Sequence, residues 1–76
     1  MSWKDAVRRA IKRRCRARKS DIFTRSDLIS NELEQIIADT HCKGATPDQT
    51  LSRVLQELRD AGEIKFINYD GTYRKL

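Results

Sequence analysis

The sequence predicts a small α+β domain in which three helices pack beside a short antiparallel sheet. Three stretches carry apolar residues at helical spacing, and two short alternating segments at the end of the chain are joined by an Asp-Gly turn signal. An apolar pair between the first two helices predicts a third strand. With 76 residues there is room for one core, so we expect a single domain over residues 1–76.

The first helix begins near the N-terminus. Ser2 can cap it, with Asp5 three residues later. An apolar stripe follows at helical spacing, formed by Trp3, Val7, Ala10 and Ile11. Arg14 falls on the same side, so its charged end must reach past the core or the helix must loosen there. We expect Trp3 to anchor the core.

Positive charge is concentrated in this helix. Residues 1–19 hold nine lysines and arginines against one acid, a net charge of +8, whereas the other 57 residues carry −3. The outward basic row is Lys4, Arg8, Lys12, Arg16 and Lys19. This division favours a basic helix that contacts phosphates and a different element that reads the bases. A solvated surface helix is the alternative.

A short strand and a second helix come next. Ile22 and Phe23 suit a third strand beside the terminal hairpin, and Thr24 with Asp27 is a second capping box. The stripe of the second helix is Leu28, Ile29, Leu33, Ile36 and Ile37. Residues 38–45 then read as a loop with a glycine for its turn.

The third helix has the strongest start signals. Thr46 can cap it, Pro47 suits its first position, and Gln49 completes a capping box. Its buried stripe is Leu51, Val54, Leu55 and Leu58. Gly62 can take the left-handed conformation that ends a helix, so the length is about 15 residues.

A hairpin ends the chain. Ile64 and Phe66 alternate with polar residues, the Asp70-Gly71 pair marks the turn, and residues 72–76 return as the second strand. We expect Tyr73 to pack in the sheet. Helix, strand, helix, helix, strand, strand is the element order of a winged helix, a fold that commonly binds double-stranded DNA.

The polar face of the third helix is the candidate reading surface. At about 100° per residue its outward side chains oppose the stripe that centres on Leu58. Arg suits guanine, Gln suits adenine, and the first turn approaches the groove floor in helix-turn-helix docking. The base-reading candidates are Thr46, Asp48, Gln49, Thr50, Ser52, Arg53 and Gln56. The phosphate-contact candidates are Arg8, Lys12, Arg16, Lys19, Lys43, Tyr69 and Arg74.

The segments FTRSDL, LSRVLQELRDAGEIKF and GTYRKL resemble the C-terminal winged-helix domain of methyl-directed restriction endonucleases of the DpnI and Dam-replacing kind. The opening SWKDAV and the closing Gly and Tyr are more loosely similar to HARE-type winged helices. The first resemblance implies a specificity domain of a restriction-modification protein that binds GATC carrying N6-methyladenine. It also implies that any nuclease lies in another domain of the parent chain. The candidates for an apolar surface against that methyl group are Cys42, Ala45, Thr46 and Pro47.

Other function classes lack their motifs. No apolar run approaches a membrane span, and no signal-peptide pattern opens the chain, so we expect a cytoplasmic location in a bacterial or archaeal nucleoid. Cys15 and Cys42 are too few for a disulfide framework or a zinc site. No phosphate loop, carboxylate pair or spaced nucleophile is present, so we expect no catalytic residue, metal or cofactor.

We therefore expect a monomeric module for double-stranded DNA, with or without adenine methylation. The alternatives are a transcription-regulator winged helix and a protein-interaction winged helix whose third helix docks a partner. In the last case the basic first helix only keeps the domain in solution.

Overall fold

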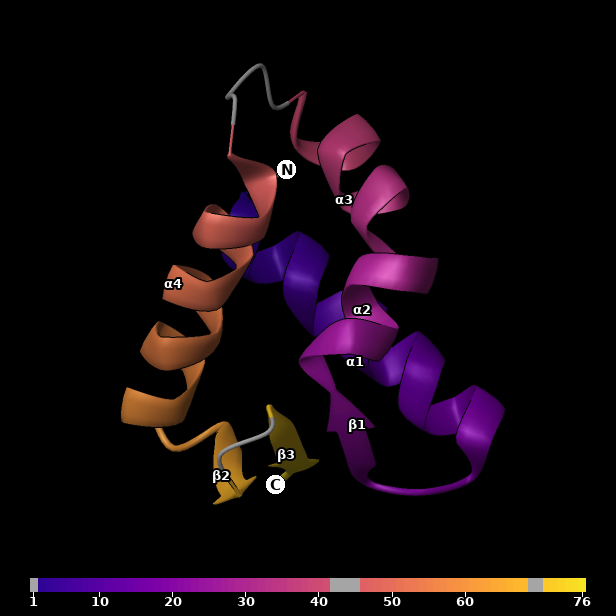
Figure 1. Cartoon of the computed structure of the whole chain (residues 1–76), viewed down its shortest axis with the longest axis vertical. Helices are drawn as coiled ribbons and strands as arrows, with labels where there is room; N and C mark the ends of the chain where they lie inside the picture. Colours follow the sequence, from indigo (N-terminus) through magenta and orange to yellow (C-terminus); the bar gives the residue numbers. More distant parts are fainter. Residues whose placement is uncertain (1, 42–45, 69–70) are drawn as a thin grey trace.

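The structure, a computed structural model, describes residues 2–41, 46–68 and 71–76 and is of the α+β class, as predicted (Figure 1). These residues form four helices and a three-stranded antiparallel sheet in an order compatible with a winged helix. The elements are α1 (Trp3–Arg18), β1 (Ile22–Thr24), α2 (Arg25–Asn31), α3 (Leu33–Thr40), α4 (Pro47–Asp60), β2 (Ile64–Asn68) and β3 (Thr72–Lys75).

The predicted caps of the first two helices are confirmed. The Ser2 hydroxyl accepts from the Asp5 backbone N–H at 3.2 Å, and the Thr24 hydroxyl accepts from the Asp27 N–H at 3.0 Å. The predicted capping box at α4 is wrong, because the Thr46 side chain makes no capping hydrogen bond. Its ψ of 64° departs from the extended backbone of the other two caps, so its hydroxyl is not directed along the helix. Pro47 does occupy the first turn of α4, as expected.

Two helices end in the same backbone motif. At the end of α4 the Glu63 N–H donates to the Leu58 carbonyl and the Gly62 N–H to the Arg59 carbonyl, which is the Schellman pattern. Gly62 has φ of 80°, as its sequence position predicts. At the end of α1 the left-handed position is held by Lys19, with φ of 52°. A side chain is strained in this conformation, whereas glycine is not.

The predicted second helix is not continuous, so the expectation of three helices was wrong by one. α2 and α3 are separated at Glu32, where φ is −124°. Two interactions lie at the break. The Asn31 side-chain amide donates to the Asp27 carbonyl at 3.1 Å, and the buried Glu32 carboxylate accepts from Arg13 of α1 at 2.7 Å.

The sheet has the order β1-β3-β2, so the strand stub pairs with the last strand as expected. Tyr73 lies opposite Phe23 in one neighbour and Phe66 in the other. Its ring stacks on Phe23 at 5.6 Å and meets the edge of Phe66 at 5.6 Å, which confirms that Tyr73 packs in the sheet. A register shift between Phe66 and Asn68 bends β2, and Ile67 is 45% exposed.

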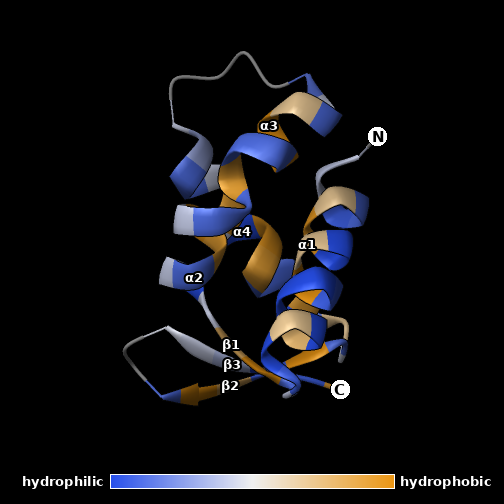
Figure 2. Ribbon diagram, turned by 90° about the vertical axis from the view of Figure 1, so that its right-hand side faces the viewer, coloured by the Kyte–Doolittle hydropathy of each residue, from blue (hydrophilic) through white to orange (hydrophobic). Residues whose placement is uncertain are grey.

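One apolar core joins all the helices to the sheet. α1 crosses behind α4 and the α2–α3 pair in Figure 1, and Figure 2 shows the hydrophobic sides of the helices turned inward. The buried apolar residues are Ala6, Val7, Ala10, Ile11, Cys15, Phe23, Leu28, Ile36, Leu51, Val54, Leu55, Leu58 and Ile64. Trp3 packs against this core while remaining partly exposed. Within the described parts of the chain, no helix has the length and apolar character needed to span a membrane.

The strained end of α1 can be tested with Lys19→Gly. Glycine removes the left-handed strain, so the free energy of unfolding should rise by about 1 kcal/mol and the melting temperature by about 4–8 °C. Ala17→Gly, two residues earlier on an exposed helical position, should lower the free energy of unfolding by about 1 kcal/mol. A lower melting temperature for Lys19→Gly would contradict the strain.

Candidate nucleic-acid interface

The outer side of α4 carries a row of exposed polar side chains. Gln49, Arg53 and Gln56 are all exposed, at positions i, i+4 and i+7 of the helix. The opposite side is the buried stripe that includes Leu55 and Leu58. Within the part of the chain that the structure describes, these three side chains form no ion pair, and they offer one guanidinium and two carboxamides to a ligand.

Arg25, which the sequence reasoning missed, lies where α2, α4 and the sheet meet. Its Nε donates to the Ser52 hydroxyl at 2.7 Å, and its Nη2 lies 3.5 Å from the Asp48 carbonyl oxygen. Its own backbone N–H donates to the Gly71 carbonyl at the start of the returning strand at 2.9 Å. The only available signal was its place directly after the Thr24 cap, at the first position of a helix.

The other predicted base-reading residues differ in their exposure and in whether their side chains already form hydrogen bonds within the fold. Thr46 and Asp48 are exposed or partly exposed at the start of α4. The Thr50 hydroxyl lies 3.4 Å from the Thr46 carbonyl, and the Ser52 hydroxyl both accepts from Arg25 and donates to the Asp48 carbonyl at 3.2 Å. Ser52 therefore positions Arg25. The predicted residues Cys42, Lys43, Ala45 and Tyr69 lie outside the residues that the structure describes.

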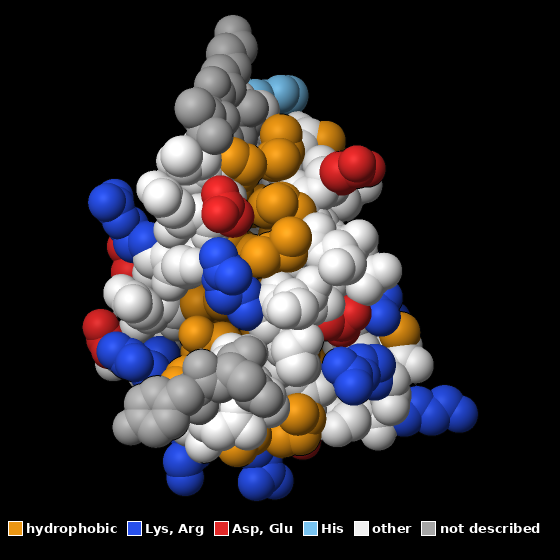
Figure 3. Space-filling view, in the orientation of Figure 1, with side chains coloured by type: hydrophobic (Ala, Val, Ile, Leu, Met, Phe, Trp, Pro, Cys, Tyr) orange, Lys and Arg blue, Asp and Glu red, His pale blue; other side chains and the backbone are white. Residues whose placement is uncertain are grey.

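A band of hydrophobic side chains lies between α4 and the α2–α3 pair on the face seen in Figure 3. The sequence-predicted apolar residues that remain partly exposed on these elements are Ile29, Leu33, Ile37 and Pro47. We call this band the apolar seam. Pro47, predicted to face a methyl group, is partly exposed in the first turn of α4.

Most of the basic residues of α1 are engaged within the fold. Arg8 was expected to contact phosphate, but its Nε and Nη2 each donate to the Glu63 carboxylate at 2.7 Å, and its Nη1 donates to Asp5 at 3.0 Å. These contacts raise the pKa of Arg8 and, through the hydrogen bonds from Arg8, lower the pKa of Glu63. Lys4 likewise lies 3.8 Å from Glu57 of α4. The Arg8–Glu63 and Lys4–Glu57 contacts join α1 to α4 and to the segment that directly follows α4.

Three further arginines of α1 pair with carboxylates of the α2–α3 region. Arg13 binds Glu32, Arg14 donates to Asp27 at 3.1 Å, and Arg18 lies 3.6 Å from the same Asp27 carboxylate. The side chains of Asp27 and Glu32 are only 13% and 10% exposed. Arg14, which the sequence placed on the apolar side, thus finds an acidic partner at the edge of the core.

Four basic residues of α1 and its C-cap form no ion pair with any described residue: Arg9, Lys12, Arg16 and Lys19. Figure 2 shows α1 at one end of the sheet and the start of β3, near Arg25, at the other. The predicted phosphate contacts Lys12, Arg16 and Lys19 therefore do not lie beside the outer row of α4. Helical periodicity in two separate helices could not reveal this, because it gives no relative orientation.

Arg74 has a different position from the other predicted phosphate contacts. It is exposed in the middle of β3, directly opposite the exposed Lys65 of β2. Two cations thus face solvent together on the outer side of the sheet.

No group of three or more potential metal ligands occurs among residues 2–41, 46–68 and 71–76. Burial raises the pKa of the Cys15 thiol, which keeps it in the less reactive protonated form. Comparison with known protein families, with curated proteins and with solved structures found no match.

The division of α1 into paired and unpaired cations can be tested by stability. Arg13→Ala leaves the buried Glu32 carboxylate without its cation, so the free energy of unfolding should fall by about 1–3 kcal/mol. Arg9→Ala, four residues earlier on an exposed position, should change it by no more than about 0.5 kcal/mol. Urea denaturation measures both free energies of unfolding. Equal losses would show that the Arg13–Glu32 ion pair stabilises the fold no more than the exposed Arg9 does.

Proposed function

We propose that the chain is a winged-helix module that binds double-stranded DNA, with α4 in the major groove. The observation that carries the proposal is the exposed row Gln49, Arg53 and Gln56 on the helix that follows α2 and α3 and precedes the β2–β3 hairpin. A helix of 14 residues with a polar outer side fits a groove about 12 Å wide. The module has no catalytic part in this proposal, and any nuclease belongs to another domain of a parent chain.

The chemistry of the row suits base edges. Arg53 can donate two hydrogen bonds to the O6 and N7 atoms of guanine, and a glutamine can pair with the N6 and N7 atoms of adenine. Thr46 and Asp48, at the start of the helix, would lie nearest the groove floor. These contacts supply specificity, because each depends on the donor and acceptor pattern of one base pair.

Phosphate contacts in this proposal come from α2 and the sheet rather than from Arg8. Arg25 uses its Nε on Ser52, which fixes the guanidinium and leaves further N–H donors for a phosphate oxygen. Besides Arg25 at the start of α2, Arg74 and Lys65 add two exposed positive charges on the sheet. Contacts of this kind set the position of the duplex and the dependence of affinity on salt.

Reading of N6-methyladenine in a GATC-like site is the finer part of the proposal. A methyl group in the major groove needs an apolar surface, and Pro47 is a partly exposed apolar residue in the first turn of α4. Methylation removes one N6 donor hydrogen, so a glutamine that gripped both N6 and N7 would favour unmodified adenine. The methyl reader thus requires that Gln49 and Gln56 do not both bind adenine in that way.

The apolar seam also favours a second candidate function, docking of a partner protein without DNA specificity. Partly exposed apolar side chains beside a polar helix can form part of a protein interface. The dependence on salt separates the two functions, since DNA binding should weaken with a slope near −0.9 per phosphate neutralised.

Arg53→Ala tests the reading role of α4. Removal of a bidentate contact should cost about 1–3 kcal/mol of discrimination at a single base pair, measured by titrating duplexes that differ only at that pair. Arg59→Ala is the matched control, because Arg59 is exposed on the last turn of the same helix and lies 3.4 Å from Asp60. If both variants discriminated like the parent chain, α4 would not be the reading helix.

A pair of GATC duplexes with and without N6-methyladenine tests the methyl reading at one fixed salt concentration. Burial of one methyl group is worth about 0.8 kcal/mol, so the methylated duplex should bind roughly fourfold more tightly or better. Equal affinities would refute the methyl reading and leave DNA binding intact. Absence of binding to either duplex, at low salt, would favour the partner-protein function.

A further inference from the structure

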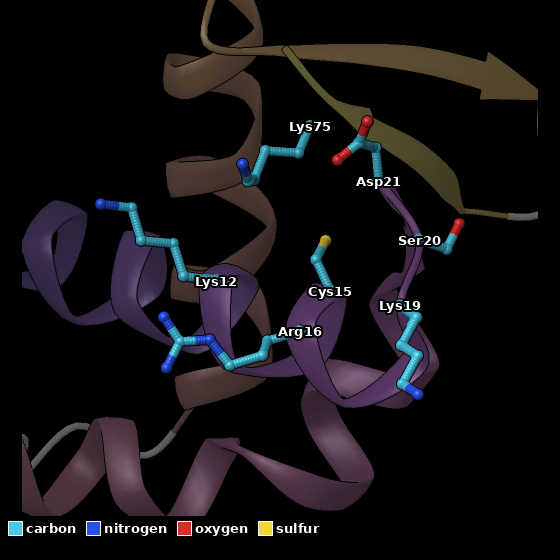
Figure 4. A pocket seen from close by; sticks show the side chains of 7 residues that line it. All are labelled: Lys12, Cys15, Arg16, Lys19, Ser20, Asp21 and Lys75. Carbon is cyan, nitrogen blue, oxygen red and sulfur yellow. The ribbon is translucent and has the colours of Figure 1, made fainter.

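An open pocket with basic walls lies between the second half of α1 and the end of β3 (Figure 4). Its volume is about 530 Å³. Four cations and one carboxylate line it, together with the thiol of Cys15: Lys12, Arg16, Lys19, Lys75 and Asp21. We call it the α1–β3 pocket. It lies at the opposite end of the sheet from Arg25, and its Lys75 is on the face of β3 opposite to that of Arg74, because neighbouring residues of a strand alternate.

The fold brings three of these cations together. Lys12 and Arg16 stand on successive turns of α1, about 6 Å apart along the helix axis. Lys75 comes from β3, where its backbone N–H donates to the Asp21 carbonyl at 2.7 Å. Figure 4 shows the Lys75 side chain extending from β3 over the Cys15 thiol toward the side on which Lys12 and Arg16 extend. Cys15 itself is only 6% exposed and forms the floor.

No carboxylate of the described residues neutralises these three charges. None of the ion pairs found in residues 2–41, 46–68 and 71–76 includes Lys12, Arg16 or Lys75. In Figure 4 the carboxylate of Asp21 lies at the other end of the pocket from Lys12 and Arg16. Like charges at i and i+4 repel, so the fold carries a small electrostatic cost here that an anion would relieve.

The pocket differs from the rest of α1 because most other cations of that helix have acidic partners. Five basic residues of the same helix have acidic partners: Lys4, Arg8, Arg13, Arg14 and Arg18. Among the described residues of α1, unpaired charge is thus concentrated in the pocket and at Arg9, which does not line it. The positive charge of Lys75 also reaches the floor, where it opposes the effect of burial on the pKa of Cys15.

We propose that the α1–β3 pocket binds the phosphodiester backbone of a second nucleic-acid segment, distinct from the duplex that α4 reads. The proposal of a second segment rests on the proposed function of α4. Ammonium and guanidinium groups are the usual ligands of phosphate oxygens. The pocket is open and its walls are mostly polar, which suits a linear polyanion lying across it better than an enclosed small molecule. One module of this kind holds two segments at once, because its two sites lie at opposite ends of the sheet.

The salt dependence of duplex binding is the first test. The variant with Lys12→Gln, Arg16→Gln and Lys75→Gln should bind a duplex of arbitrary sequence with a smaller salt slope, lower by about 0.9 for each phosphate that is no longer neutralised. Arg9→Gln and the single variant Arg16→Gln are the matched pair, since each removes one exposed arginine from α1 and only Arg16 lines the pocket. Circular dichroism checks that these variants fold. Equal slopes for the matched pair would overturn the proposal.

The number of duplexes bound is the second test. Native mass spectrometry with a duplex of about 10 base pairs, roughly one helical turn, should show two duplexes on the parent chain and one on the triple variant. The double variant Gln49→Ala with Arg53→Ala should also hold one, through the pocket. Absence of all binding in that double variant, or a single duplex on the parent chain that the triple variant still binds, would overturn the second site.

Failure of the pocket and failure of the α4 proposal give different results. If the parent chain and Gln49→Ala with Arg53→Ala each held one duplex while the triple variant held none, the pocket would stand and the reading role of α4 would fall. Inorganic triphosphate is the remaining probe. If it raised the melting temperature of the parent chain but not of the triple variant, and no second duplex bound, the pocket would take a small phosphate ligand and the nucleic-acid assignment would fail.

Discussion

Two nearly buried carboxylates, Asp27 and Glu32, impose the constraint on which the arrangement of the helices depends. A carboxylate at the edge of a core needs a cation or several hydrogen bonds, because its desolvation otherwise costs more than packing returns. Asp27 meets Arg14 and Arg18, and Glu32 meets Arg13. All three arginines belong to α1, so these carboxylates fix α2 and α3 against one flank of that helix. On the other flank Arg8 binds Glu63 and fixes the end of α4.

This pairing changes the meaning of the strongly basic first helix. A net charge of +8 in residues 1–19 suggests a surface for polyanions, yet more than half of the cations in that stretch serve the fold. The pairs on exposed side chains contribute little each, whereas those that neutralise Asp27 and Glu32 matter more because water is scarce around them. Among the described residues, the remaining positive charge of that stretch lies at the α1–β3 pocket and at Arg9, and the reading surface proposed on α4 is nearly neutral.

Long-range packing also explains why sequence patterns did not predict Arg25 of the candidate interface. Arg25 lies at the start of α2. Its position is fixed by three neighbours that are distant in the chain: Ser52, the Asp48 carbonyl and Gly71. No periodicity joins these positions. By contrast, Gln49, Arg53 and Gln56 share one helix with a strong apolar stripe, and a stripe on one side leaves the outer row on the other. Local patterns thus predicted the row, and long-range packing supplied the residue beside it.

The sequence alone determined the α+β class, the order of the elements, the caps at Ser2 and Thr24 and the end of α4 at Gly62, because each depends on residues within a few positions of one another. It also determined that Ile22 and Phe23 form a strand. Tertiary structure decided that the second helix breaks at Glu32, that Arg8 is an ion-pair partner, and that Lys12, Arg16 and Lys75 share one pocket. These outcomes depend on which carboxylate meets which cation across the core. The periodicity of apolar residues along the chain does not predict that pairing, because the pairing is set only when the helices pack.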